Sequence, residues 1–173
     1  MENGNKAMRE WLEAIGIALL LAILIKTFVV DTIQVDGNSM IPTLRHHDRL
    51  IMNKFEYRMQ KPEKGEIVVF QYPHDRTYYF IKRVIAVEGD TVEIANGEVI
   101  VNGQVLKEPY ILEKTLGDFS KRLVPKDTIF VLGDNRNNSK DSRFKDVGPV
   151  SLKLVKGRAV FRIWPFRSLG KIM

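Results

Sequence analysis

The chain begins with a long apolar run, after which the hydrophobic pattern changes to short runs. Between Trp11 and Val30 the only charged residues are Glu13 and Lys26. A helix of about 20 apolar residues is long enough to cross a bilayer. Lys26 can extend its ammonium group to one interface, and Trp11 suits the opposite interface. This pattern predicts a short N-terminal tail and a transmembrane signal-anchor over residues 1–30.

Two other interpretations of this segment stay open from the residues alone. A cleaved signal peptide also has a basic start and an apolar stretch, but small residues surround its cleavage point. Here the stretch from Lys26 to Asp31 contains the bulky Phe28. A buried helix of a soluble protein is the second alternative. Lys6 and Arg9 precede the run, so the positive-inside rule favours a cytoplasmic N-terminus and an external C-terminal domain.

After residue 30 the pattern is typical of β-structure. Short β-branched or aromatic runs alternate with turn residues, and Asn96-Gly97 between two such runs predicts a tight hairpin. We expect one N-terminal transmembrane helix followed by a mainly β, partly closed barrel-like domain over residues 31–173. Residues 108–124 have weaker patterning and are expected to form an excursion or insertion. The expected strands are 67–72, 78–87, 91–95, 98–101, 104–106, 128–132 and 158–164.

Composition narrows the possible chemistry. The chain of 173 residues has a formal net charge of +6 and no cysteine. Disulfides, thiol chemistry and cysteine zinc sites are therefore excluded, and we expect no metal and no cofactor. The lysines and arginines are scattered along the chain instead of forming a basic arm, so we expect no nucleic-acid partner.

Ser39 stands out because of its place in the chain. It begins the run Ser39-Met40-Ile41-Pro42-Thr43-Leu44, nine positions beyond Val30. An extended chain advances at most ~3.3–3.6 Å per residue, so this hydroxyl stays within roughly 30 Å of the apolar segment. Pro42 fixes its own φ and restricts Ile41, which predicts a turn that presents Ser39. If Ser39 is a nucleophile, its substrate lies at the membrane surface.

Lys82 is a candidate general base. It lies in a predicted strand whose two faces are apolar apart from Lys82 on one and Arg83 on the other, so its side chain is either partly buried or extended out at an edge. Burial lowers the pKa of a lysine. A fall from ~10.4 to near 8 corresponds to ~3 kcal/mol and gives an amine that can accept a proton at neutral pH. From the residues alone, an edge or salt-bridged lysine is the simpler interpretation.

Two further groups of polar residues could carry chemistry. The stretch 133–143 is dense in Asn, Asp, Ser and Arg; it reads as a long polar turn, or as a hydrogen-bonded network that fixes geometry. His46-His47 and His74-Asp75 invite a triad or metal interpretation, but the chain has neither a His-Glu-x-x-His pattern nor a Gly-x-Ser-x-Gly elbow. We expect these histidines to be surface loop residues.

Taken together, the motifs resemble those of bacterial type I signal peptidases, the membrane-anchored Ser–Lys proteases that remove signal peptides from exported proteins. The resemblance covers nearly the whole chain, and the motifs occur in the family's order. They are the anchor, Ser39-Met40-x-Pro42-Thr43-Leu44, the run at 64–70, the Phe80–Ile85 run with Gly89-Asp90, and the loop at 133–143. The resemblance favours a catalytic Lys82 over an edge lysine.

The resemblance implies a role for each matching residue. Ser39 would be the nucleophile, Lys82 the general base, and Ser139 the residue that orients the lysine. A Ser–Lys dyad is chemically sufficient, because a neutral amine replaces imidazole and needs no buried Asp to fix a tautomer. Ion pairs and hydrogen bonds would hold the site through Arg83, Asp134, Arg136, Asp141 and Arg143.

The oxyanion site implied by the resemblance differs between branches of the family. Some members place a serine two positions before the nucleophile, where its hydroxyl is a donor. Here that position is Gly37, as is common in the Gram-positive branch. The Ser39 backbone N–H is then expected to be one donor, with Gly37 offering only its backbone.

The family's substrates carry small residues, typically Ala-x-Ala, before the scissile bond. Two shallow apolar pockets would explain that choice, and an extended substrate would lie against strand edges. The implied partners are exported preproteins and membrane lipid, close to the protein-export channel, and the implied location is the plasma membrane with the domain outside. The expected pocket walls, for which core packing is the alternative, are Met40, Leu44, Ile81, Ile33 and Val35.

The sequence leaves two rival functions open. A repressor-type Ser–Lys self-cleaving protease has a related β core, but the apolar anchor argues against it. A membrane-anchored β domain that binds secretory partners without catalysis would leave Ser39 and Lys82 idle.

Overall fold

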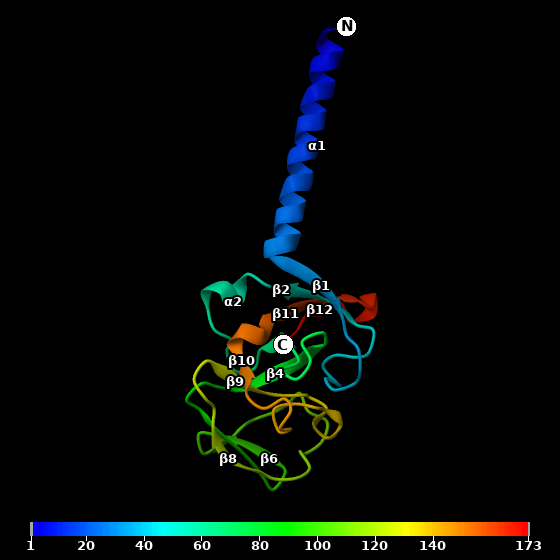
Figure 1. Cartoon of the computed structure of the whole chain (residues 1–173). Coiled ribbons are helices and arrows are strands. Elements are labelled where there is room, and N and C mark those ends of the chain that lie inside the picture. The colour runs from blue at the N-terminus through cyan, green and yellow to red at the C-terminus, as the bar shows by residue number, and fades with distance from the viewer. Residues whose placement is uncertain (1, 173) are drawn as a thin grey trace.

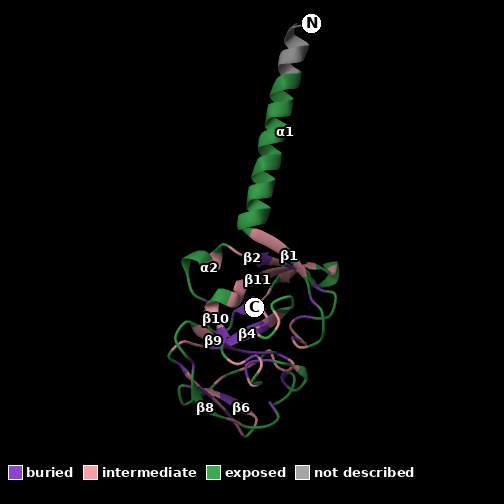
Figure 2. Ribbon diagram, in the orientation of Figure 1, coloured by how far each residue is buried: buried purple, intermediate pink, exposed green. Residues whose placement is uncertain are grey.

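The structure, a computed structural model, describes residues 2–172, and it describes side chains from Met8 onward. Helix α1 (Glu2–Phe28) projects away from a compact β domain (Figure 1). Its segment Met8–Phe28 is long and apolar enough to cross a membrane and is not buried against the domain (Figure 2). Met1, Met173 and the side chain of Lys6 lie outside the described residues.

The β domain contains two antiparallel sheets. The larger runs in the order β1-β2-β11-β3-β4-β9-β10, with β12 paired to β11, and the smaller runs β7-β6-β5-β8. The larger sheet consists of β1 (Val30–Gln34), β2 (Arg49–Asn53), β3 (Ile67–Gln71), β4 (Tyr79–Val87), β9 (Thr128–Leu132), β10 (Val150–Ser151), β11 (Val155–Trp164) and β12 (Gly170–Lys171). The smaller consists of β5 (Thr91–Ala95), β6 (Glu98–Val101), β7 (Gln104–Val105) and β8 (Phe119–Leu123). Short helical turns complete the domain: α2 (Glu56–Met59), η1 (Arg136–Asn138), η2 (Leu152–Leu154) and η3 (Phe166–Ser168).

The predicted class, a mainly β domain after one apolar helix, is confirmed, but the partly closed barrel is not. Among the described strands, β1 and β10 end the larger sheet and do not pair with each other, so that sheet is open. One reason is that β10 has only two residues, which leaves little backbone to continue the ladder.

The local patterns account for most strands, and the exceptions have physical causes. Asn96 and Gly97 both have positive φ, 54° and 78°, as a tight hairpin between β5 and β6 requires. Strand β1 escaped prediction because only Val30 belongs to the apolar run, and Asp31, Thr32 and Gln34 are polar. Strand β8 lies inside the supposed excursion, and four of its five residues are exposed, so it lacks the alternation of a half-buried strand.

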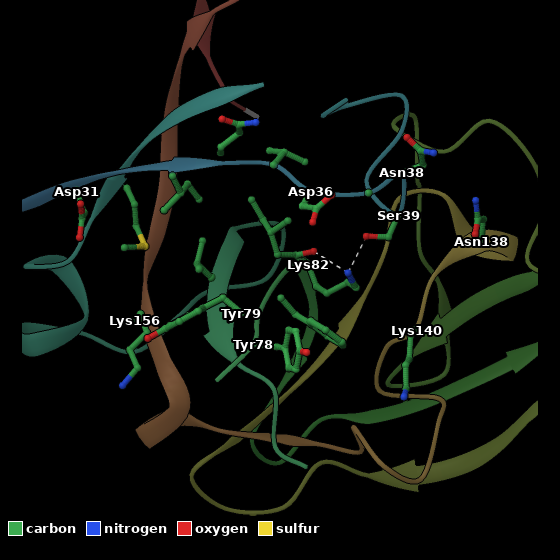
Figure 3. A pocket seen from close by; sticks show the side chains of 18 of the residues that line it. Asp31, Asp36, Asn38, Ser39, Tyr78, Tyr79, Lys82, Asn138, Lys140 and Lys156 are labelled. Atoms are coloured by element: carbon green, nitrogen blue, oxygen red, sulfur yellow. Dashed lines mark hydrogen bonds between the residues drawn. The ribbon is translucent and has the colours of Figure 1, made fainter. Parts of the chain in front are cut away.

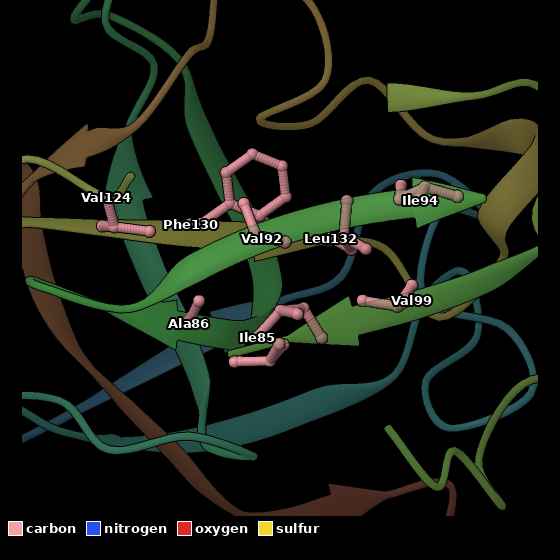
Figure 4. Packing of buried hydrophobic residues seen from close by; sticks show 9 residues of the cluster. Ile85, Ala86, Val92, Ile94, Val99, Val124, Phe130 and Leu132 are labelled. Atoms are coloured by element: carbon pink, nitrogen blue, oxygen red, sulfur yellow. The ribbon is translucent and has the colours of Figure 1, made fainter. Parts of the chain in front are cut away.

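Strand β4 is the centre of the packing. Ile85 and Ala86 pack with Phe130 and residues of the smaller sheet (Figure 4), whereas Val84 packs with Phe70 in a second cluster. Apolar contacts on both sides explain why this strand reads as almost continuously hydrophobic. The strand that carries Lys82 is therefore held firmly in the domain.

Gly157 allows β11 to lie close against β2. A Cβ atom at this position would lie 2.5 Å from the Asn53 carbonyl oxygen and 2.7 Å from Met52 Cγ. We predict that Gly157→Ala lowers the free energy of unfolding by about 1–3 kcal/mol, because the strands must separate to admit the methyl group. Denaturant titration measures the change. Gly170→Ala is the control, because no neighbouring atom lies within 4 Å of its added Cβ; equal losses in both variants would contradict the packing argument.

Candidate active site

The turn that carries Ser39 is held by the core beneath it. Val35 before the turn and Met40 and Leu44 within it are fully buried in one cluster. The Leu44 amide donates to the Met40 carbonyl oxygen at 2.9 Å. Gly37 has φ +95°, a left-handed conformation that glycine adopts at little cost. The chain can therefore turn sharply after β1 and leave Ser39 half-buried at the end of that strand.

Lys82 meets Ser39 from the opposite side of the site. Its Nζ lies 2.7 Å from Ser39 Oγ and 2.9 Å from the Ile81 carbonyl oxygen (Figure 3). Only 4% of the residue is exposed. Burial lowers the pKa of the Lys82 amine to about 8, although the charges of Asp141 and Asp134 act in the opposite direction. About a tenth of this amine is then unprotonated at pH 7, and this neutral form can take a proton from the adjacent hydroxyl.

Asp134 connects the strand of Lys82 to the turn of Ser39. Arg83, the neighbour of Lys82, donates from Nε to Asp134 Oδ1 at 2.9 Å and from Nη2 to Oδ2 at 2.7 Å. Thr43, in the Ser39 turn, donates its hydroxyl to Asp134 Oδ2 at 2.5 Å. Bidentate guanidinium–carboxylate pairs fix orientation as well as distance. The carboxylate therefore holds the two sides of the site in register.

The other members of the expected network form a second group. Asp141 accepts hydrogen bonds from the Gly133 amide at 3.1 Å and from Arg143 Nε at 2.8 Å. Arg143 also donates to the Arg136 carbonyl oxygen at 2.5 Å. The Arg136 guanidinium donates from Nε to the Gly133 carbonyl oxygen at 2.9 Å and pairs with Glu108 at 2.6 and 2.7 Å. The structure thus brings the five predicted residues into the same region, but as two linked groups.

Sequence reasoning missed two residues that support this region. Glu108 is the partner of buried Arg136, and the ring of Tyr110 lies 3.9 Å from the Arg83 guanidinium. Both belong to the segment 108–124 that was expected to be an excursion. Glu108 and Tyr110 contact residues that are distant in the sequence, and such contacts leave no periodic pattern. The polar Glu108 and aromatic Tyr110 on either side of Pro109 were the one weak indication of a structural role.

Ser139 lies close to the dyad, yet its hydroxyl does not bond to Lys82. Its Oγ is buried and has no hydrogen-bond partner among the described residues. A Cβ on Gly133 would lie 2.2 Å from Ser139 Oγ and 2.4 Å from the Ser39 carbonyl oxygen, so only glycine allows this approach. The Asn135 amide then donates to that same Ser39 oxygen at 3.0 Å.

The two backbone groups expected at the oxyanion site differ in their present bonds. Among the described residues, the Ser39 amide donates to no acceptor. The Gly37 amide donates to His46 Nδ1 at 3.1 Å. His46 thus supports the Gly37 turn. No motif in the sequence indicates this role. Of these two expected donors, the Ser39 N–H is thus unpaired among the described residues, whereas the Gly37 N–H already has an acceptor.

A cavity of about 740 Å³ opens beside the dyad between β1 and the beginning of β4. Three of the predicted pocket residues, Ile33, Val35 and Ile81, are among its lining residues. Met40 and Leu44 are not; the structure buries them in the core below, with 1% and 0% exposure. The prediction that Met40 and Leu44 line the pocket therefore differs from the structure, in which these side chains hold the Ser39 turn from beneath.

An apolar helix, an open β domain and a serine paired with a buried lysine describe a class of membrane-associated hydrolases. The chain belongs to the signal peptidase family, peptidase S26, which matches residues 8–164.

Individual relatives agree with this assignment. The chain is 41% identical to signal peptidase I of Leptolyngbya laminosa, over 97% of this chain and 85% of that protein. It is 35% identical to signal peptidase I S of Bacillus subtilis, over 96% and 95% respectively. A crystal structure of a signal peptidase I from Enterococcus faecalis superposes with a TM-score of 0.52 at 32% identity, covering 57% of this chain and 97% of that one.

The buried amine should cost stability. We predict that Lys82→Met raises the free energy of unfolding at pH 7 by about 2–3 kcal/mol, because the folded chain no longer desolvates an ammonium group. The pKa of Lys82 falls from 10.5 to about 8 on folding. The penalty is therefore complete below pH 8 and shrinks as the pH rises toward 10.5, so the gap between variant and parent should narrow there.

Denaturant titrations of both proteins at pH 7 and pH 10 measure that gap. Lys153→Met, at an exposed position, is the control and should change little. A Lys82→Met protein that is less stable than the parent at both pH values would contradict the burial cost.

Proposed function

We propose that the protein is a membrane-anchored serine endopeptidase that cleaves signal peptides from exported preproteins, with Ser39 as nucleophile and Lys82 as general base. The observation that carries the proposal is the 2.7 Å contact between Ser39 Oγ and the buried Lys82 Nζ. Membership of the signal peptidase family supports the substrate class.

The geometry suggests a sequence of proton transfers. Lys82 takes the Ser39 proton as Oγ attacks the scissile carbonyl carbon, and the Ser39 N–H donates to the oxygen that becomes negative. Lys82 then gives its proton to the leaving amine, and an acyl ester remains on Ser39. In the second half, Lys82 takes a proton from water, which attacks the ester, and returns a proton to Ser39 Oγ.

Ser139 is proposed to orient the amine during these steps. The hydroxyl is buried beside the Ser39 backbone and lacks a partner among the described residues. When Ser39 Oγ becomes bonded to the substrate, Lys82 loses one of its two hydrogen-bond partners. A rotation of either side chain would let Ser139 accept that bond. Arg83, Asp134, Arg136, Asp141 and Arg143 are proposed as structural supports of the site.

The backbone around the cavity suits an extended peptide. Among the described strands, β1 pairs only with β2, and the part of β4 from Tyr79 to Lys82 pairs only with β3, because pairing with β9 begins at Arg83. Two unpaired edges therefore flank the cavity, and a substrate strand can add to them. The walls formed by Ile33, Val35 and Ile81 favour small side chains of the Ala-x-Ala kind.

We place α1 in the plasma membrane, with the N-terminus in the cytoplasm and the domain, residues 31–173, on the outer face. The length and apolar composition of Met8–Phe28 support membrane insertion, and the basic N-terminal residues support the orientation. The domain would then contact lipid and receive preproteins close to the export channel.

Loss of either member of the dyad should stop cleavage. We predict that Ser39→Ala and Lys82→Ala each lower kcat/KM on an Ala-x-Ala preprotein by about a thousandfold or more, because nucleophile and base act as a unit. Cleavage of a preprotein by the purified full-length protein measures the effect. His74→Ala, at an exposed position outside the site, is the control and should keep full activity. Full cleavage by both dyad variants would show that Ser39 and Lys82 are not the catalytic residues.

The pH dependence should report the buried amine. We predict that kcat/KM rises as the pH passes about 8, because the unprotonated Lys82 is the active form and burial lowers its pKa to about 8. Ser139→Ala should lower kcat and shift this limb if Ser139 orients the amine. A limb near the ordinary histidine value of ~6.5 would point to histidine catalysis and against the dyad.

A further inference from the structure

The cavity extends well beyond the dyad, and its far end has a charge that the catalytic steps do not use. We infer that Lys156 is a specificity-determining residue that favours substrates with an acidic side chain about four to six positions before the scissile bond. This inference rests on the proposed function and concerns the same cavity.

The position of Lys156 follows from the strand register. Met52 on β2 pairs with Asp31 on β1 and with Ala159 on β11. Because β1 and β11 are both antiparallel to β2, they run in the same direction. Going back from Ala159 to Lys156 therefore leads toward the anchor helix, just as going back from Asp31 does. In Figure 3, Asp31 and Lys156 lie on the side of the cavity away from Ser39.

This end of the cavity adjoins the exit of α1. Lys54, which also lines the cavity, donates to the Lys26 carbonyl oxygen in the last turn of the helix at 3.0 Å. A signal peptide carries its hydrophobic segment before the cleavage site, and that segment must return to the membrane. A substrate bound at Ser39 therefore passes Lys156 with residues that precede the scissile bond.

The spacing gives the positions that are affected. An extended peptide advances about 3.3 Å per residue. A substrate that runs along β1 from Ser39 to Asp31 passes the strand from Gln34 back to Asp31. Four to six substrate residues cover that path, and the long lysine side chain adds reach at the far end.

Charge pairing distinguishes Lys156 from the other lysines that line the cavity. Lys82 contacts Ser39, Lys54 lies 3.3 Å from an Asp31 carboxylate oxygen, and Lys140 is paired with Asp146. The half-buried Lys156 has no carboxylate or hydrogen-bond partner among the described residues. An unpaired ammonium group in the wall of a cavity attracts a substrate carboxylate and repels a substrate cation.

A charge-swap experiment tests the inference. The full-length protein in zwitterionic detergent is given three versions of one Ala-x-Ala preprotein, with Glu, Gln or Lys at the fifth position before the scissile bond. We expect kcat/KM to favour Glu over Lys by about fivefold, the range of a partly exposed ion pair. Lys156→Glu should invert that order. Lys153→Glu, which makes the same charge change at an exposed position outside the cavity, should leave it unchanged.

Each other outcome overturns the inference and shows where it fails. If the parent protein cleaves all three substrates at equal rates, the proposed function stands and the charge selection does not. If the Gln substrate is not cleaved at all, the proposed function itself fails. The last arm repeats the series in vesicles with anionic lipid. If Lys156→Glu lowers cleavage of the Gln substrate only there, the ammonium group contacts lipid headgroups instead of substrate.

Discussion

The contact between the Lys82 amine and the Ser39 hydroxyl is the interaction on which the site depends. An amine becomes a base near neutral pH only when it is shielded from water, and here the shielding comes from the centre of the larger sheet. Strand β4 carries Lys82 between apolar clusters on both sides. The Ser39 turn, held from below by Met40 and Leu44, closes the site. The same packing that places the two atoms 2.7 Å apart also changes the chemistry of one of them.

The charged residues around the dyad could have cancelled this effect. Asp141 and Asp134 both raise the pKa of Lys82 and therefore oppose its burial. Each carboxylate, however, is paired with an arginine: Asp134 with Arg83 and Asp141 with Arg143. An arginine stays protonated, so its positive charge partly cancels the electric field of the carboxylate that it binds. The network thus provides rigid geometry beside the lysine while limiting the negative charge that the lysine meets, and the pKa of the amine stays low.

Local signals predicted the parts of this fold that local chemistry determines. Asn96-Gly97 specified a hairpin because its backbone angles suit few other residues. The Ser39 and Lys82 motifs indicated a dyad because their residue types and order are informative together. What the residues could not show depends on distant contacts. Alternation does not distinguish Met40, which faces the core, from Ile33, which faces the cavity. The pairing of Glu108 with Arg136 and the packing of Tyr110 on Arg83 become visible only once the chain is folded.

The folded chain also sharpens the meaning of the short tether between helix and nucleophile. Chain length alone allows Ser39 to lie anywhere within roughly 30 Å of the apolar segment. In the structure, five of the intervening positions, counted from Val30, form β1, which pairs with β2 along its whole length. Lys54 bonds to the last turn of α1, and Arg58 lies over the Phe28 ring at 5.3 Å. The connection is therefore a strand braced at the helix exit. If α1 spans a bilayer, the height of Ser39 above the membrane is set by the sheet, and the end of the cavity lined by Lys54 and Lys156 lies toward the exit of α1.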